Sequence, residues 1–218
     1  MVDQLRDEVK SFLLAGHETS ASMLAWVNYE LWKNQECRTK VKEEGQRVFT
    51  EDNDGTGRSA SHPENPFEAL PLPPTEKFKE CTYTLNALKE TLRRHTPVPV
   101  VVRQAVNEDT LDGNYIAPGT RMFCSISSVH LDPEVWEAPL EFHPERFEEK
   151  HDPNAFLPFI IGPRNCLGQH LALLEARVIL SLLTQRFTLT PIDQCKGGEA
   201  DDYTVPVIPK YGMFVHVT

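Results

Sequence analysis

Apolar and small side chains recur at steps of three and four positions along residues 4–33, which predicts one face of a long amphipathic helix. The stripe is apolar at both ends, but its middle, AGHETS at positions 15–20, is small and polar. A purely structural helix would keep leucine or isoleucine there, so we expect a functional role for this segment. The stripe consists of Leu5, Val9, Phe12, Gly16, Ser20, Met23, Val27 and Leu31.

Three further segments carry a helical pattern. The charged segment QECRTKVKEEGQRVF predicts a second helix at positions 35–49, and KFKECTYTLNALKETLRRH predicts an amphipathic helix at 77–95. Pro97 stops the latter, because proline cannot continue a helix. Residues 167–187 are strongly apolar and predict the last helix.

Short alternating segments predict strands around these helices. Residues 97–106 and 120–129 are separated by D-G and P-G turn signals, so they predict a small antiparallel unit. The tail at 203–217 also alternates as strands do. The fold class expected from the pattern is therefore mainly α with small antiparallel β units, without internal repeats or a linker that would divide it.

Two stretches predict loops instead of regular elements. Residues 51–75 are rich in Gly, Ser, Asn, Asp and Pro, and DNDG within them suggests a calcium loop, but Thr50 occupies the position of its first ligand. Residues 131–154 contain many prolines and aromatic residues with little periodicity. A loop of that length in a compact domain is usually functional or organised by another group.

Composition excludes several classes of protein. The 218 residues contain 22 Lys and Arg against 32 Asp and Glu, a net charge of -10 that argues against nucleic acid as a partner. Five cysteines, widely spaced and without C-x-x-C, argue against a disulfide framework and for a reducing compartment. The first residues lack the features of a signal peptide, and charges interrupt every long apolar segment, so no membrane span is predicted.

Cys166 lies in a glycine-containing loop just before the last predicted helix, in FIIGPRNCLGQ. A helix N-terminus favours the thiolate, Gly162 and Gly168 allow special backbone angles and close approach, and Arg164 supplies a fixed positive charge. Three interpretations are open: a buried structural cysteine, a zinc ligand together with His170, or an axial thiolate ligand of haem. Zinc would need two more ligands, and no second pair has the required spacing.

The residues of this loop resemble the haem-ligand loop of the cytochrome P-450 family. Its pattern F-x-x-G-x-R-x-C-x-G is filled by Phe159, Gly162, Arg164, Cys166 and Gly168. Other motifs of the family occur in its order, namely AGHETS at 15–20, ETLR at 90–93, HLDPEVW at 130–136 and PERF at 144–147. The resemblance covers nearly the whole chain and implies a haem-thiolate monooxygenase.

The resemblance also implies roles around haem b. Cys166 would be the axial ligand of the iron, Arg164 and Arg103 would pair with haem propionates, and Phe159 would pack near the sulfur. Gly162 and Gly168 would let the loop approach the macrocycle. For Arg103, an ordinary charge on an edge strand is the alternative.

On the opposite face of the haem, the central helix of the family would supply small and protic residues. Ala15 and Gly16 would let the backbone approach closely, and the Thr19 hydroxyl would bond the carbonyl of Ala15 and loosen the helix there. Glu18 and Thr19 would manage protons during oxygen activation. Without the haem loop, a solvated helix face would be the simpler interpretation of this segment.

The remaining family motifs imply a buried charge network instead of catalysis. Glu90 and Arg93 are three residues apart on one helix and would join Arg146 in shaping the haem-ligand side. Removing one member of such a buried set costs roughly 3–5 kcal/mol.

The resemblance begins at Met1 with the family's central helix. Residues 1–218 are therefore expected to be the C-terminal, haem-ligating part of one cytochrome P-450 domain, a fragment with the N-terminal half absent. Electrons would come from NAD(P)H through a reductase, and the substrate would be a small apolar organic molecule, with a lipid or fatty acid suggested by the loop sequence. A eukaryotic parent would be compatible with anchoring at the endoplasmic reticulum, and any other with the cytoplasm. The alternative is a non-catalytic remnant, or a thiolate module that binds haem or metal without turnover.

Overall fold

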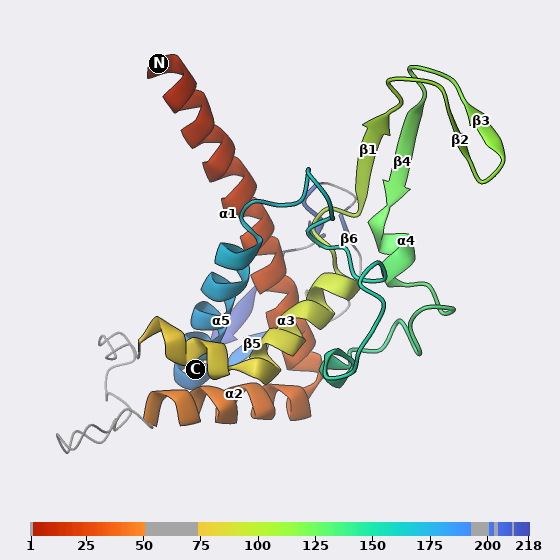
Figure 1. Ribbon diagram of the computed structural model, residues 1–218. Coiled ribbons are helices and arrows are strands. Elements are labelled where there is room, and N and C mark those ends of the chain that lie inside the picture. The colour runs from red at the N-terminus through yellow and green to blue at the C-terminus, as the bar shows by residue number, and fades with distance from the viewer. Residues whose placement is uncertain (1, 51–73, 193–200, 203–204, 211) are drawn as a thin grey trace.

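A computed structural model describes residues 2–50, 74–192, 201–202, 205–210 and 212–218 of the chain (Figure 1). Helices form the body of the molecule, and four two-stranded antiparallel sheets are attached to it. The fold class predicted from the hydrophobic pattern agrees with this architecture. Most of the loop predicted at 51–75 lies outside the described residues.

The long helices follow the predicted periodicity closely. α1 covers Val2–Lys33 and α2 covers Gln35–Thr50, with Asn34 between them. A 3-10 turn, η1 at Thr75–Glu80, precedes α3 at Thr82–Arg94, so the helix predicted at 77–95 is divided at Cys81. α5 covers Gln169–Arg186, within the predicted range of 167–187.

The antiparallel unit between α3 and the irregular segment agrees with its prediction in part. β1 at Val100–Gln104 pairs with β4 at Arg121–Ser125, and the intervening turn region carries a further hairpin, β2 at Asp109–Leu111 with β3 at Asn114–Ile116. The predicted strand at 120–129 was too long. Ser125 ends it, because its hydroxyl accepts a hydrogen bond from Ser128 N at 3.3 Å and begins α4 at Ile126–His130.

The C-terminal strands include two that the pattern did not predict. β8 at Val215–Val217 pairs with β5 at Leu189–Pro191, and β7 at Ile208–Pro209 pairs with β6 at Asp201–Asp202. β7 and β8 lie in the tail that was predicted to form strands. Each of these strands has two or three residues, too few to show an alternating pattern in the sequence.

One hydrophobic core joins four helices. Its buried side chains come from the C-terminal half of α1, from α2, from α3 and from α5. In Figure 1 the N-terminal half of α1 extends away from this body, and the hairpins β1–β4 and β2–β3 extend from it elsewhere. The buried members are Met23, Val27, Leu31, Val41, Ala87, Leu88, Leu92, Ala176 and Leu180.

The start of α3 is fixed by a side chain from α2. Both carboxylate oxygens of the buried Glu44 accept hydrogen bonds there, from Tyr83 N at 2.8 Å and from Thr84 N at 2.8 Å. Thr84 Oγ1 donates a further bond at 2.7 Å. The first N–H groups of a helix have no partner within it, so Glu44 satisfies them and fixes α3 against α2.

Candidate functional site

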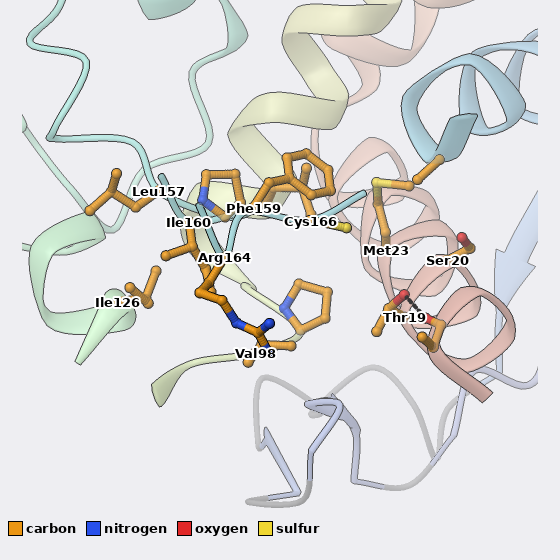
Figure 2. Close-up of a pocket in the computed structure, with 15 residues that line it drawn as sticks. Thr19, Ser20, Met23, Val98, Ile126, Leu157, Phe159, Ile160, Arg164 and Cys166 are labelled. Carbon is orange, nitrogen blue, oxygen red and sulfur yellow. Dashed lines mark hydrogen bonds between the residues drawn. The ribbon is translucent and has the colours of Figure 1, made fainter. Parts of the chain in front are cut away.

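An apolar cavity of about 260 Å³ lies between α1 and the loop that carries Cys166. Figure 2 shows Thr19, Ser20 and Met23 on the α1 side, and Phe159, Ile160, Arg164 and Cys166 on the loop side. The connection between α3 and β1 and the start of α4 complete the wall. The remaining lining residues are Ala15, Leu92, Pro97, Val98, Ile126, Leu157, Pro158 and Ala172.

The Cys166 loop is closed by its own backbone. Cys166 N donates a hydrogen bond to Phe159 O at 2.9 Å, and Asn165 N donates to Gly162 O at 3.1 Å. Gly162 has a φ of 82°, a conformation that favours glycine, and Ile160 adopts a φ of 60° without that advantage. The loop is therefore a tight fold-back that presents the exposed Cys166 thiol to the cavity.

The helix after this loop begins later than the sequence suggested. Gly168 is the N-cap of α5, so Cys166 precedes the first helical residue, Gln169, by three positions. The φ of Gly168 is −85°, which any residue adopts, and the expectation of a special angle there was wrong. A Cβ on Gly168 would lie 3.9 Å from the sulfur of Cys166, in ordinary contact.

The α1 side of the cavity has the predicted local geometry. Thr19 Oγ1 donates a hydrogen bond to Ala15 O at 2.6 Å, shown dashed in Figure 2. Ala15 and Thr19 both line the cavity, one helical turn apart, and Met23 continues the same face. Gly16 and Glu18 are exposed on the helix and are not among the lining residues.

The two predicted propionate partners differ in position. Among the described residues that line the cavity, Arg164 alone is charged. Arg103 is exposed on β1, where its Nη1 donates to Val102 O at 3.0 Å, and it does not line the cavity. The structure brings Arg164 and Cys166 together and leaves Arg103 apart from them.

The structure also brings Glu90, Arg93 and Arg146 together. Arg93, fully buried, donates to the two Glu90 oxygens from Nε at 2.8 Å and from Nη2 at 2.9 Å. Arg146 Nε donates to Glu90 Oε1 at 3.0 Å, and so does the backbone N–H of His143. The buried carboxylate of Glu90 therefore has four hydrogen-bond donors, which compensates for its loss of hydration.

The same arginines organise the irregular segment at 131–154. Arg93 Nη2 donates to Pro139 O at 2.8 Å, and Arg146 Nη1 donates to Glu137 O at 3.0 Å. PERF at Pro144–Phe147 forms the 3-10 turn η2, which packs on α3. Arginine side chains, which only donate hydrogen bonds, thus satisfy backbone carbonyls of the long loop and order it.

The other described cysteines differ from Cys166 in their surroundings. Burial raises the pKa of the Cys37 thiol and the pKa of the Cys81 thiol, which favours their protonated forms. Cys124 is exposed on β4 and does not line the cavity. Among the four cysteines within the described residues, all of them free thiols, Cys166 alone faces this cavity.

The described residues contain no group of three or more His, Cys, Asp or Glu side chains placed to hold a metal ion, so His170 has no further partners for a zinc site with Cys166. Within the same residues, no helix combines the length and apolar character needed to cross a membrane.

Several cavity residues were not singled out from the sequence. Leu92 lies on α3, at a variable position of the ETLR motif, Ile126 lies on α4, and Leu157 lies in the segment before the Cys166 loop. Met23 belonged to the predicted stripe of α1, where it was indistinguishable from a core residue. Tertiary structure alone brings these side chains to one cavity.

Comparison with known proteins agrees with the geometry. The family model Cytochrome P450 matches residues 2–211. Mouse Cytochrome P450 4X1 is 34% identical over 218 residues, which cover 98% of this chain and 39% of that protein. Carotene epsilon-monooxygenase from Arabidopsis thaliana is 37% identical, with 85% of this chain and 32% of that protein covered. Taurochenodeoxycholic 6 alpha-hydroxylase from Sus scrofa is 36% identical, with 86% and 34% covered.

The chain thus spans about two fifths or less of the length of these relatives. The matched range contains both walls of the cavity, from Ala15 on α1 to Ala172 on α5. The chain belongs to the cytochrome P450 family.

Proposed function

We propose that this chain supplies the haem-thiolate site of a monooxygenase that oxidises an apolar organic substrate. The observation that supports this most strongly is the thiol of Cys166, which faces a largely apolar cavity opposite the Thr19 face of α1 and is alone in doing so among the described cysteines. Names of two relatives, a carotene epsilon-monooxygenase and a taurochenodeoxycholic 6 alpha-hydroxylase, describe oxygen insertion into largely hydrocarbon molecules.

The residues present fit haem b. A flat apolar macrocycle suits apolar walls such as Leu92, Ile126 and Phe159, and its iron suits the soft sulfur donor of Cys166. The guanidinium of Arg164, which lines the same wall, suits a propionate. Gly162 and Gly168 flank the thiol without side chains of their own, in keeping with close approach of the loop.

Thiolate-ligated haem supplies the chemistry of oxygen activation, with electrons that would reach it from NAD(P)H through a reductase. Phe159 packs against the hydrophobic core and lines the cavity together with Cys166, so it would limit water around a sulfur that binds haem iron. Arg164 would hold a propionate of the cofactor through its guanidinium group.

Proton transfer is the role that we assign to residues of α1. The Thr19 hydroxyl uses its hydrogen to bond Ala15 O, which leaves its oxygen lone pairs available to accept a bond from a protic group in the cavity. Glu18, exposed on the same helix, exchanges protons with solvent and passes them toward Thr19. Ala15 lines the cavity with a single methyl group, and the neighbouring Gly16 has none, so a substrate or oxygen could approach the helix there.

The carbon monoxide difference spectrum of the reduced, hemin-loaded 218-residue chain tests this proposal. We expect the long-wavelength band of thiolate-ligated haem, and we expect Cys166→Ser to abolish it. The matched control is Cys124→Ser, because Cys124 is also an exposed free thiol but lies on β4, away from the cavity. A thiolate band that persists in Cys166→Ser, or one that is lost equally in Cys124→Ser, contradicts the assignment.

A further inference from the structure

His130 is the last residue of α4 and is fully buried. Its backbone and its ring each make a hydrogen bond to a different part of the site. Its backbone carbonyl accepts a hydrogen bond from Arg93 Nη1 at 2.7 Å. Its ring Nε2 accepts the backbone N–H of Leu157 at 2.8 Å. One residue therefore contacts both the buried charge network and the segment that leads into the Cys166 loop.

Leu157 is well placed to pass this contact to the thiol. It lines the cavity, and its carbonyl accepts Ile160 N at 3.1 Å, the first turn of the fold-back. Phe159, two residues later, accepts Cys166 N through its carbonyl at 2.9 Å. The chain of hydrogen bonds thus runs from Glu90 through Arg93, His130 and Leu157 to the backbone that carries Cys166.

The ring of His130 has a defined orientation. Phe156 stacks on it with ring centroids 5.5 Å apart. Because Nε2 accepts from Leu157, the hydrogen of the neutral ring is on Nδ1. The acceptor role of Nε2 toward Leu157 therefore fixes the tautomer of the ring, and the stacking of Phe156 fixes its plane.

We infer that His130 is a positioning residue, which holds the start of the Cys166 loop against the Glu90–Arg93–Arg146 network through its Nε2 acceptor. The inference rests on the proposed function for its consequence, because a misplaced loop would weaken thiolate ligation. The hydrogen bond itself belongs to the chain without any cofactor. The two can therefore be tested separately.

The first test is amide hydrogen exchange on the haem-free, full 218-residue chain. In His130→Leu, which removes the acceptor at similar volume, the Leu157 amide should exchange at least about tenfold faster, as expected for a lost buried hydrogen bond. In His130→Gln, a side-chain carbonyl can reach the position of Nε2, and exchange at Leu157 should return to within about twofold of the parent chain.

Two controls separate positioning from loss of stability. His130→Asn keeps a polar side chain but places its oxygen near the Nδ1 position, so exchange of the Leu157 amide should be as fast as in His130→Leu. This variant also provides the comparison if His130→Leu fails to fold. Val48→Ala removes fully buried methyl groups at the far end of α2 and should raise exchange across the chain without a selective effect at Leu157.

The second readout is the carbon monoxide spectrum after loading with hemin. We expect His130→Leu and His130→Asn to lose thiolate-type band intensity relative to total haem, and His130→Gln to retain it. Exchange at Leu157 that is unchanged in both His130→Leu and His130→Asn, or that is not restored in His130→Gln, overturns the inference while leaving the haem-thiolate proposal intact. Absence of a thiolate band from the parent chain contradicts the proposed function and leaves the exchange result valid.

Discussion

His130 also illustrates how a single buried side chain makes the molecule sensitive to acid. Burial, assisted by the positive charge of Arg93, lowers the pKa of His130 from 6.5 to about 4. The ring is therefore neutral near pH 7, as its acceptor role toward Leu157 requires. A protonated ring would turn Nε2 into a donor that faces another donor.

The sign of the resulting pH dependence follows from the lowered pKa. The unfolded chain takes up a proton at this histidine near pH 6.5, whereas the folded chain does so only near pH 4. The free energy of unfolding should therefore fall as the pH is lowered from about 6.5 to about 4, by up to about 1.4 kcal/mol per pH unit from this group. Urea denaturation at several pH values measures the slope.

His130→Gln is the matched comparison for that measurement, because it keeps an acceptor and removes the titration. The parent chain should lose more stability than the variant across this pH range. An equal dependence of the unfolding free energy on pH in the two chains would contradict the lowered pKa of His130.

The sequence indicated individual residues well where a motif combined several of them. The hydrogen bond from Thr19 to Ala15 and the pair of Glu90 and Arg93 were expected from their spacing on a helix. That Arg146 joins this pair was implied only by the family resemblance. The ordinary angle at Gly168 was not expected, since a glycine in a sequence does not reveal which φ it adopts. His130 lay within a recognised motif, but its partner Leu157 is 27 positions away.

Among the elements, α3 and the irregular segment at 131–154 depend on each other. Glu90 and Arg93 are both 0% exposed, and together with Arg146 they connect the helix to backbone carbonyls of that segment. A buried arginine without its carboxylate would be an uncompensated charge.

Glu90→Gln should therefore lower the free energy of unfolding by roughly 3–5 kcal/mol, the range for breaking a buried ion pair. Chemical denaturation followed by circular dichroism measures this loss. Asp3→Asn is the control, because the Asp3–Arg6 pair has the same spacing on a helix but is exposed, and its removal should change stability little. Equal losses in the two variants would contradict the argument from burial.

A second connection joins α1 to the C-terminal strands. Ser22 Oγ and Trp26 Nε1, the latter at 3.3 Å, both donate to the buried carbonyl of Val207, just before β7. Val207 N in turn donates to Pro97 O at 2.9 Å, and Pro97 lines the cavity. The backbone of Val207 thus fixes α1 relative to the connection between α3 and β1.

Because either donor alone satisfies the Val207 carbonyl, the two side chains should be coupled. Ser22→Ala should cost about 1 kcal/mol of unfolding free energy, and the double variant with Trp26→Phe should cost more than the sum of the single variants, because it leaves a buried acceptor without a partner. Urea denaturation of the parent chain, the two single variants and the double variant measures the coupling free energy. If the losses of unfolding free energy in the single variants add up to that of the double variant, the two donors are not coupled through the shared carbonyl.

Element boundaries could be predicted where a pattern was long. α1, α2 and α5 each show several turns of helical spacing, and their observed ends fall within about three residues of the expected ones. A strand such as β5 has too few residues to alternate visibly, and its pairing with β8 joins residues 24 or more positions apart. Local capping at Ser125 overrode the strand pattern that continued beyond β4.

For the whole molecule, the distribution of exposed apolar side chains is uneven. The N-terminal half of α1 carries an exposed stripe of Leu5, Val9 and Phe12, whose exposed fractions are 66%, 48% and 61%. Burial along α1 begins only at Ser22. A helix that packs against nothing is marginal in water, and a continuous apolar stripe favours association.

The 218-residue chain should therefore self-associate as its concentration rises, and Phe12→Glu should shift it toward monomer. The substitution places a charge in the stripe, and an interface that buried it would lose at least about 1.4 kcal/mol, or tenfold in the association constant. Sedimentation velocity over a range of concentrations measures this shift. Val106→Glu is the control, because Val106 is 86% exposed between β1 and β2 but lies apart from the stripe, and isolated exposed apolar residues are normal. A parent chain that stays monomeric, or an equal effect of both substitutions, would show that this face of α1 does not drive association.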